Sequence, residues 1–293
     1  MAVKTPGSLG ALQYVAEASY GTTPNTALSY FGHMLTMAED GSTDEEEIVQ
    51  DGSRIFGAVL HRAVSAGFTA KLTVFRDQGT TYYLKNLVNQ AYGPTADLGS
   101  FSALMKLASD EYVLFHGCKI DKLVIGADRV GDKVTADVTV KALKQDAHTS
   151  SKPTPPGSES TGPTTKVPII YDAYPTATIG GSSKTVEAKS FSISISNNLS
   201  EQEGIVSGVA YTAGNGIVPG ETEVELEYKL LSKDSYWDNL KLSHGDGITI
   251  AQVIGGHTYT FSNCYIVTGD HPSREQSTYD ETVRFRAGSL TVV

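Results

Sequence analysis

The residue types that most often perform chemistry are present in this chain, but they are scattered. A metal centre needs several imidazole, thiolate or carboxylate ligands at fixed spacing on one or two elements. The histidines never pair at such a spacing, so surface and turn positions account for them better than a metal site. They are His33, His61, His116, His148, His244, His257 and His271.

Two polar segments have part of the residue pattern of known binding loops. The stretch from Gly126 to Lys133 has the outline of a phosphate-binding loop, but Asp132 would set a carboxylate against the phosphates, so a hairpin turn fits it better. The acidic stretch from Asp40 to Glu47 lacks the alternating ligands and the fixed glycine of a calcium loop. Neither segment predicts a cofactor or a metal ion.

The chain also lacks a recognisable catalytic nucleophile. No serine lies in a nucleophile elbow, and Cys118 follows Gly117 inside an apparent strand, where a thiol packs more often than it reacts. Cys264 is the only other cysteine. The two thiols lie at matching places in the two halves of the chain and should occupy separate cores, so we predict free buried thiols in a reducing compartment. We predict that the protein is not an enzyme.

The elements that position these residues are mainly strands. Alternation of apolar and polar residues predicts half-buried strands, and Thr80 or Thr81 is expected to cap a helix that ends near Ala91. A second, short helix is expected over 235–242. The predicted strands are Phe68–Arg76, Tyr112–Leu114, Cys118–Ile125, Val134–Ala142, Phe191–Ser196, Val224–Leu230, Ile248–Ile254, Thr258–Val267 and Thr282–Val293.

The two halves of the chain repeat each other. A strand that starts at Leu72 leads to an aromatic block around Tyr83, as a strand at Leu226 leads to Tyr236. The segment 115–120, Phe-His-Gly-Cys-Lys-Ile, resembles the segment 261–266, Phe-Ser-Asn-Cys-Tyr-Ile. A repeat of half the chain is too long for a solenoid, so it predicts two related domains in tandem.

Composition agrees with two β-rich domains. The chain has 293 residues and a net charge of −10, an acid excess that disfavours a broad phosphate-binding surface. Residues 147–168 are almost wholly small, polar or proline, a composition typical of a linker. We therefore expect domains at 1–146, with an N-terminal arm and an acidic loop, and at 169–293. Neither a secretory signal nor a membrane span is expected.

Several of these segments resemble the major tail tube protein of long-tailed phages and related viruses. The resemblance rests on the arm 17–24, Glu-Ala-Ser-Tyr-Gly-Thr-Thr-Pro, on the helix after the first long strand, and on 115–123 with the strand that follows. Segment 189–199 is similar to the later part of the same proteins. The resemblance implies tandem tube-type β-sandwich or barrel domains, each with one flanking helix.

The resemblance also implies a function, that of a structural virion protein of the tail, assembled in the host cytoplasm. Subunits would form stacked rings around a channel that passes viral DNA without specific binding, together with tape-measure and tail terminator or tip proteins. Because such tubes are generally built on six tube domains per ring, two domains per chain predict trimers with pseudo-sixfold symmetry. Glu45, Glu46 and Glu47 lie in an exposed loop or ribbon expected to contact the adjacent ring.

Two other functions remain open at this point. A capsid decoration or tail completion protein would also be β-rich, but it needs no long acidic ribbon reaching an axial neighbour. A carbohydrate-binding or adhesin module would use exposed aromatic side chains for stacking. Trp237 and the tyrosines are the candidates for that role, although Trp237 lies in the helix-like block, where an aromatic more often packs in the core.

Overall fold

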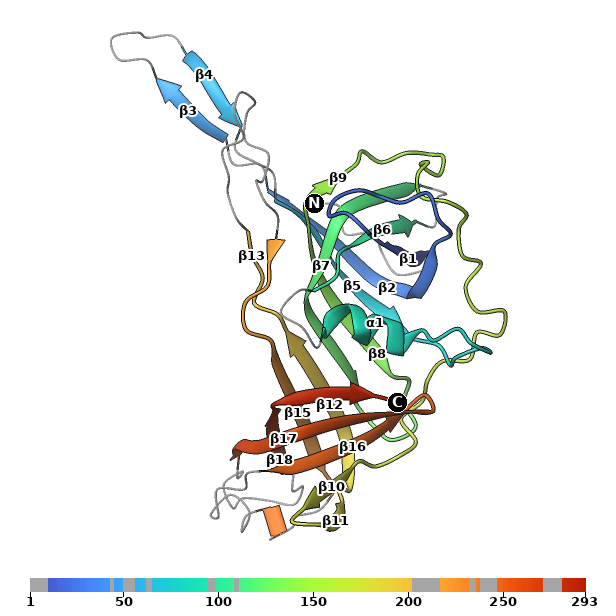
Figure 1. The fold of residues 1–293 in the computed structure, drawn as a ribbon, viewed down its shortest axis with the longest axis vertical. Coiled ribbons are helices and arrows are strands. Elements are labelled where there is room, and N and C mark those ends of the chain that lie inside the picture. Colours follow the sequence, from blue (N-terminus) through green and yellow to red (C-terminus); the bar gives the residue numbers. More distant parts are fainter. Residues whose placement is uncertain are drawn as a thin grey trace.

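The computed structural model shows two β-rich halves joined side to side, with a thin ribbon projecting from the first half (Figure 1). Helix α1 (Leu84–Ala91) covers part of the first half. The described residues are 10–42, 45–49, 56–61, 65–93, 98–107, 111–201, 217–231, 236–237, 247–270 and 281–293.

The first half is built around a closed barrel. Its elements are β1 (Ala11–Ala16), β2 (Ser29–Ser42), β5 (Ser65–Thr73), β6 (Phe101–Lys106), β7 (Tyr112–Ala127), β8 (Thr135–Ala142) and β9 (Lys144–Gln145), with the ribbon strands β3 (Glu45–Val49) and β4 (Phe56–His61). The strands pair in the order β7, β6, β1, β2, β5, β8, and β8 pairs back with β7. This closure leaves no free edge between the first and last strands of the barrel.

The second half pairs its strands in the same order, with one interruption. Its elements are β10 (Thr176–Ile179), β11 (Ser182–Thr185), β12 (Ala188–Ser196), β13 (Ser200–Glu201), β14 (Ile217–Val218), β15 (Glu223–Leu230), β16 (Ile248–Ile254), β17 (His257–Asp270), β18 (Thr282–Ala287) and β19 (Ser289–Val292). The order is β11, β10, β16, β17, β18, β15, β12. Strands β11 and β12 together take the place of β2. Between them, the Val186 amide donates to the Pro175 carbonyl and the Glu187 carbonyl accepts from the Leu231 amide.

The two cysteines mark equivalent bulges in the two halves. The β6–β7 ladder shifts register beside Cys118, and the β16–β17 ladder shifts in the same way beside Cys264. The residue before each cysteine is left-handed, with φ of 61° at Gly117 and 54° at Asn263. Glycine and asparagine are the residues that adopt this conformation most readily, so both bulges rest on suitable residues.

The bend after β8 is repeated after β18. One residue, Leu143, separates β8 from β9, and its amide donates to the His116 carbonyl at 2.9 Å. One residue, Gly288, separates β18 from β19, and its amide donates to the Ser262 carbonyl at 3.0 Å. Shared bulges and a shared bend therefore give the two halves one topology.

These landmarks also fix which residues correspond, and they correct the match suggested by the sequence. Strand β5 shifts register against β2 between Leu72 and Lys71, and β15 shifts against β12 between Leu230 and Lys229. Leu72 therefore corresponds to Leu230. The expected match with Leu226 is wrong by four residues, because alternation with a period of two cannot by itself fix the register of a strand.

The two halves are joined by a direct strand pairing. The last part of β7 pairs antiparallel with β12, from Lys122 opposite Ser196 to Ala127 opposite Phe191. We call this pairing the internal joint. It merges the strands of both halves into a single 15-stranded sheet, and one continuous cluster of buried side chains extends through both halves.

Both cysteines are free and fully buried, as predicted. Burial raises the pKa of the Cys118 thiol well above its ordinary range and that of Cys264 to about 12. The expectation that they lie in separate cores is wrong, because both belong to the continuous cluster. The strand pairing across the internal joint, which periodicity does not reveal, is what merges the cores.

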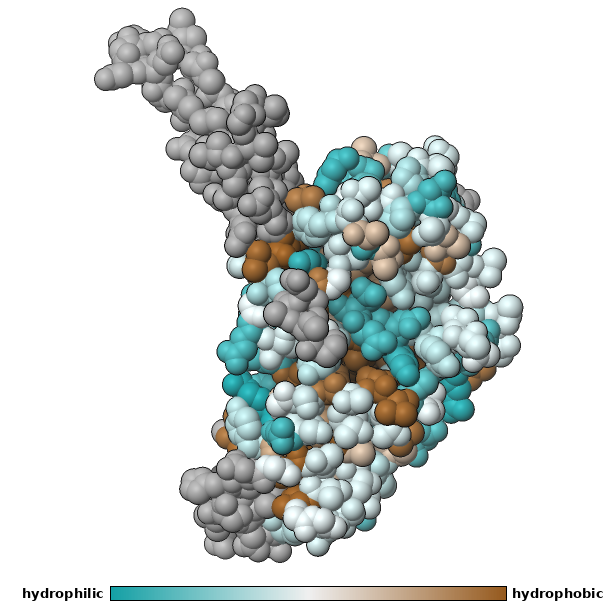
Figure 2. Space-filling view, viewed as in Figure 1, coloured by the Kyte–Doolittle hydropathy of each residue, from teal (hydrophilic) through white to brown (hydrophobic). Residues whose placement is uncertain are grey.

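The helix starts differently from the prediction. Thr80 and Thr81 do not cap it; α1 begins after Tyr83 with no side-chain cap. The Tyr83 amide instead donates to Asp77 Oδ1 at 3.0 Å. The outer side of α1 forms a hydrophilic patch in Figure 2, and its inner side is buried. Of the second predicted helix, only Tyr236 and Trp237 are described, and both are helical.

Residues 147–168 form an irregular segment that follows the first half. The Leu28 amide donates to the Ser158 carbonyl, and the Gly157 amide donates to the Thr26 carbonyl, both at 2.9 Å. Further on, the Thr164 amide donates to Gln78 Oε1 at 3.0 Å. The segment is thus held to the barrel by hydrogen bonds of its own backbone.

Candidate functional site

One side of the sheet across the internal joint carries a continuous polar surface, which we call the polar face. The strands that build it alternate strictly between buried and solvent-facing residues, as in β8 and β15. Directly opposed residues form rows that cross from one half to the other. One such row runs through Thr36, Lys71, Asp137, Val124, Ser194, Glu225, Arg286 and Tyr265, on strands β2, β5, β8, β7, β12, β15, β18 and β17.

Several cations on these rows form ion pairs with carboxylates on the neighbouring strand. Lys71 Nζ lies 3.6 Å from Asp137 Oδ2. In the second half, Arg284 Nε donates to Glu227 Oε2 at 2.7 Å, and Arg286 Nη2 lies 3.0 Å from Glu225 Oε1. Such partly exposed pairs add little stability, but they cancel charge locally.

The acid excess of the chain does not gather on the polar face. Its described cationic residues are at least as numerous as its carboxylates, and three of them, Lys71, Arg284 and Arg286, form ion pairs with carboxylates. The cations are Lys71, Lys119, Lys122, Lys141, Lys229, Arg284 and Arg286, and the carboxylates are Asp40, Asp137, Glu223, Glu225 and Glu227. The polar face is therefore close to neutral.

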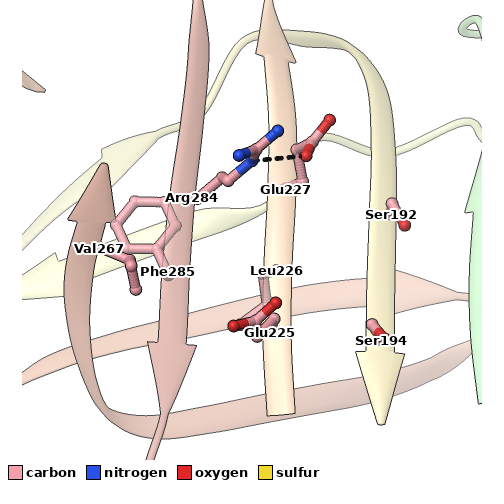
Figure 3. Close-up of a pocket in the computed structure, with 8 residues that line it drawn as sticks. All are labelled: Ser192, Ser194, Glu225, Leu226, Glu227, Val267, Arg284 and Phe285. Atoms are coloured by element: carbon pink, nitrogen blue, oxygen red, sulfur yellow. Dashed lines mark hydrogen bonds and ion pairs between the residues drawn. The ribbon is translucent and has the colours of Figure 1, made fainter. Parts of the chain in front are cut away.

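A shallow hollow of about 250 Å³ lies on the polar face in the second half. Figure 3 shows Arg284 turned toward Glu227 on the neighbouring strand, with Ser192 and Ser194 on the strand beyond. Its lining holds no histidine, cysteine or lysine. Paired charges and hydroxyls of this kind offer hydrogen bonds but no base beside a nucleophile, so the hollow does not have the composition of a catalytic site. Its lining is Ser192, Ser194, Glu225, Leu226, Glu227, Val267, Arg284 and Phe285.

The acidic residues expected to contact another ring lie elsewhere. Glu45, Glu46 and Glu47 form the start of β3, and their positions pair with residues 59–61 of β4. The β3–β4 ribbon points away from both halves (Figure 1). The structure thus places these residues on a projecting ribbon and does not bring them to the polar face.

A partly buried series of hydrogen bonds from a hydroxyl through an imidazole to a carboxylate occurs beside the Cys118 bulge. Thr23 Oγ1 lies 2.7 Å from His116 Nδ1, and His116 Nε2 lies 2.8 Å from Asp146 Oδ2. Thr23 also bonds to Ser102 Oγ, which donates to Glu17 Oε1. The order resembles a catalytic triad, but the Thr23 side chain is buried and has no access to a substrate.

The same hydrogen-bonded network also holds the arm 17–24 in place. Glu17 accepts from the Gly117 amide at 2.9 Å and from the Gly21 amide at 2.8 Å. Lys144 and His116 contact Asp146; burial raises the pKa of that carboxyl, and the hydrogen bonds from these two residues outweigh it and lower the pKa. The arm is therefore fixed on the barrel by a polar network with a structural role.

The sequence predicts the strands of the polar face other than β2, but it gives their solvent-facing residues no role. The signal was present in the polar half of each alternating strand, such as Glu225 and Glu227 in β15. What alternation cannot provide is the strand order, which places β12 beside β7 and makes separate surfaces continuous. The polar face is thus a property of the topology.

Two further features concern the described part of the chain. No group of three or more histidine, cysteine, aspartate or glutamate residues there is arranged to hold a metal ion. Among the same residues, no helix has the length and apolar character needed to cross a membrane.

The chain matches the model of a known protein family. The family model described as "Phage tail tube protein" matches residues 7–287, nearly the whole chain. A search of curated proteins found none that matches.

Proposed function

The chain belongs to the phage tail tube protein family, and on that premise we propose that it assembles into the hollow tube of a viral tail. Membership of this family makes it a structural protein of the tail. We propose further that copies close into rings, that the rings stack, and that viral DNA passes through the channel. In this proposal the protein has no enzymatic activity and needs no cofactor.

The observation that carries the proposal is the sheet that crosses the internal joint. Two halves of one topology are already joined by β7 and β12, so each chain supplies two successive segments of a larger sheet. A ring closes only when every edge finds a partner. We propose that three chains close the ring with pseudo-sixfold symmetry, with domains at 1–146 and 169–293 and the segment 147–168 bridging them.

We propose that the polar face lines the channel. DNA adheres to surfaces that offer several unpaired cations, because each neutralised phosphate releases counterions. On this face Arg284 is bonded to Glu227, and Arg286 lies against Glu225 and Glu223. The pairing of these two arginines with carboxylates, in place of the overall acidity of the chain, supports passage without sticking.

The projecting ribbon is the proposed contact between rings. Its strands pair only with each other among the described residues, so within that part of the chain the ribbon forms no ladder with its own barrel. We propose that Glu45, Glu46 and Glu47 meet the adjacent ring in the assembled tail. Tape-measure and tail terminator or tip proteins are further proposed partners, and assembly is proposed to occur in the host cytoplasm.

A carbohydrate-binding role is the weaker alternative. Trp237, the expected stacking residue, is buried, and its ring packs edge to face against Phe285 at 5.8 Å and Tyr236 at 5.0 Å. A buried indole offers no platform to a sugar. A capsid decoration or tail completion role remains a second alternative, which the ribbon disfavours.

Electron microscopy of the purified chain tests the proposal. Concentrated protein should form rings or tubes with a central channel, and averaged images should show three chains per ring. Six chains per ring would overturn the trimer and keep the tube. Protein that stays monomeric, or binds only to capsid surfaces, would overturn the tube itself.

A further inference from the structure

The internal joint shows how two copies of this topology pair edge to edge. The end of β7 pairs with β8 on one side and with β12 on the other. Just beyond it, the Asn197 amide donates to the Asp121 carbonyl at 2.8 Å, and Asn197 Nδ2 donates to the Ile120 and Ala91 carbonyls. A specific backbone register and a buried side chain thus hold this joint.

Each half contributes one edge to the internal joint, so each half has one corresponding edge left over. Strand β17 corresponds to β7, and its residues Tyr265–Asp270 pair only with β18 in the described structure. Strand β2 corresponds to β12, and its residues Thr36–Ser42 pair there only with β5. We call these two segments the outer edges.

The outer edges also carry exposed apolar side chains. Tyr265 and Val267 on β17 are 41% and 44% exposed, and Leu35 beside the β2 edge is 38% exposed. At the corresponding places of the internal joint the chain has Lys119 and Asp121, which bond across the joint to the Ile217 carbonyl and the Leu199 amide. Exposed apolar groups on unpaired strand edges indicate surfaces that a partner covers.

We propose that β17 of one copy pairs antiparallel with β2 of a second copy, in the register of the internal joint. This inference rests on the proposed function and specifies the partner surfaces that close the ring. The partner is another copy because the two outer edges are the counterparts of two edges that already pair with each other. One joint then lies within each chain and one between successive chains.

The shared bulges predict the register. β7 and β17 shift register at Ile120 and at Ile266, so Lys122 corresponds to Thr268. The bulges of β2 and β12 make Ser42 the counterpart of Ser196. Because Lys122 lies opposite Ser196, Thr268 should lie opposite Ser42 of the next copy, and Gly269 opposite Gly41.

Disulfide cross-linking of assembled protein tests this register. Directly opposed residues in an antiparallel pair have Cα atoms about 4.5 to 5.5 Å apart, within the range of a disulfide. The S42C/T268C double variant should therefore form covalent bonds between copies on oxidation. In a closed ring of three, the ladder of products on a denaturing gel should end at the trimer.

The chain offers matched controls for the test. K122C/S196C places the same pair at the internal joint and should cross-link within one chain, at any dilution. A38C/T268C shifts the register by four residues and should cross-link at least tenfold less. Mixing S42C protein with T268C protein should give covalent dimers, which confines the reaction to different copies.

The outcomes separate this inference from the proposed function. Rings or tubes that form without S42C/T268C cross-links, or with equal cross-linking of A38C/T268C, would overturn the register and keep the tube. Absence of any ring or tube for the unmodified chain would overturn the proposed function. If the variants assemble poorly, hydrogen exchange on the unmodified chain decides, since 36–42 and 265–270 must gain protection on assembly; unchanged exchange there would overturn the pairing.

Discussion

Gly117 lies against Leu143 so closely that a Cβ at position 117 would come within 2.8 Å of Leu143 Cβ. In the second half, a Cβ on Gly288 would come within 3.1 Å of Asn263 Cβ. Gly117 corresponds to Asn263, and Leu143 corresponds to Gly288. Bulge and bend therefore approach each other closely in both halves. The glycine that permits this approach lies at the bulge in the first half and at the bend in the second half.

Replacing Gly117 with asparagine should destabilise the chain by about 2 to 3 kcal/mol, because overlap with Leu143 adds to the strain of a left-handed residue. The G79N control has a similar φ of 61° but open space around it, and it should cost about 1 kcal/mol or less. In an L143G background, G117N should cost clearly less. Denaturant unfolding of the unmodified chain, G117N, L143G and the double variant measures this coupling. If the changes in unfolding free energy of the two single variants simply add in the double variant, the proposed close contact between positions 117 and 143 would be contradicted.

His257 Nε2 bonds to Asp77 Oδ2 between the two halves. Asp77 Oδ1 also accepts from the Tyr83 amide at the start of α1. D77A removes both bonds and should lower the unfolding free energy by about 2 to 3 kcal/mol, and H257Q by about 1 kcal/mol. The D172N control loses only an exposed ion pair with Arg76 and should change it by at most about 0.5 kcal/mol. An equal effect of D77A and D172N would refute the role of Asp77.

His148 ties the segment after β9 to two acidic side chains. Its Nδ1 lies 2.7 Å from Glu111 and its Nε2 3.1 Å from Glu39. Burial lowers the pKa of His148, but the hydrogen bonds to both carboxylates outweigh it and raise the pKa. Because the folded value is raised, the stabilisation is complete below the ordinary pKa of 6.5 and is lost as pH rises through the raised pKa.

An NMR titration of the His148 ring should therefore show a midpoint above the ordinary value. E111Q should move it back toward that value, since one acceptor loses its charge. A His148 midpoint at or below the ordinary value would show that the two contacts do not form in solution.

Neutralising carboxylates on the polar face should make assembled tubes retain DNA. E225Q/E227Q removes the charge of Glu227 beside Arg284 and of Glu225 beside Arg286, while Glu223 stays 3.6 Å from Arg286, so the polar face of each chain gains two units of positive charge. Co-sedimentation with a short oligonucleotide should rise severalfold, and added salt should reverse the rise. E187Q/E221Q makes the same charge change at exposed positions outside the polar face and should have little effect. Equal retention by both variants would contradict a channel lined by the polar face.

The proposed register also sets Asp40 opposite Asp270 of the next copy. Like charges at opposed positions oppose pairing by up to about 1 kcal/mol. D40N should therefore lower the protein concentration needed for assembly, by about fivefold at most, and salt should have a similar effect on the unmodified chain. Light scattering measures the threshold, and D128N, in an exposed turn, is the control. A higher threshold for D40N would argue against the register.

The strands with one buried side were predictable, and those with two buried sides were not. Alternation identified β5, β8, β12 and β15, whose outer residues are polar. Strands β1 and β6 are not among the predicted strands, because consecutive residues in both, such as Leu12 to Val15, are buried on opposite sides. A strand covered on both sides has no period of two to detect.

Three other differences between the sequence-based predictions and the structure have separate causes. The sequence predicts two strands, Tyr112–Leu114 and Cys118–Ile125, yet the structure has one strand, β7, which continues through Gly117 as a bulge. Asp77, six residues before Tyr83, supports the helix start from a distance that no capping pattern describes. The polar face needed the pairing of β7 with β12, a contact between distant segments that no local pattern contains.

The internal joint changes the thermodynamics of any ring built from this chain. Joints within a chain form as it folds, so they lose no translational freedom on assembly and do not respond to dilution. Only the joints between copies obey mass action. A ring that dissociates should therefore release whole chains with their halves still paired, and the concentration dependence of ring closure should report on the β17–β2 contact and not on the internal joint.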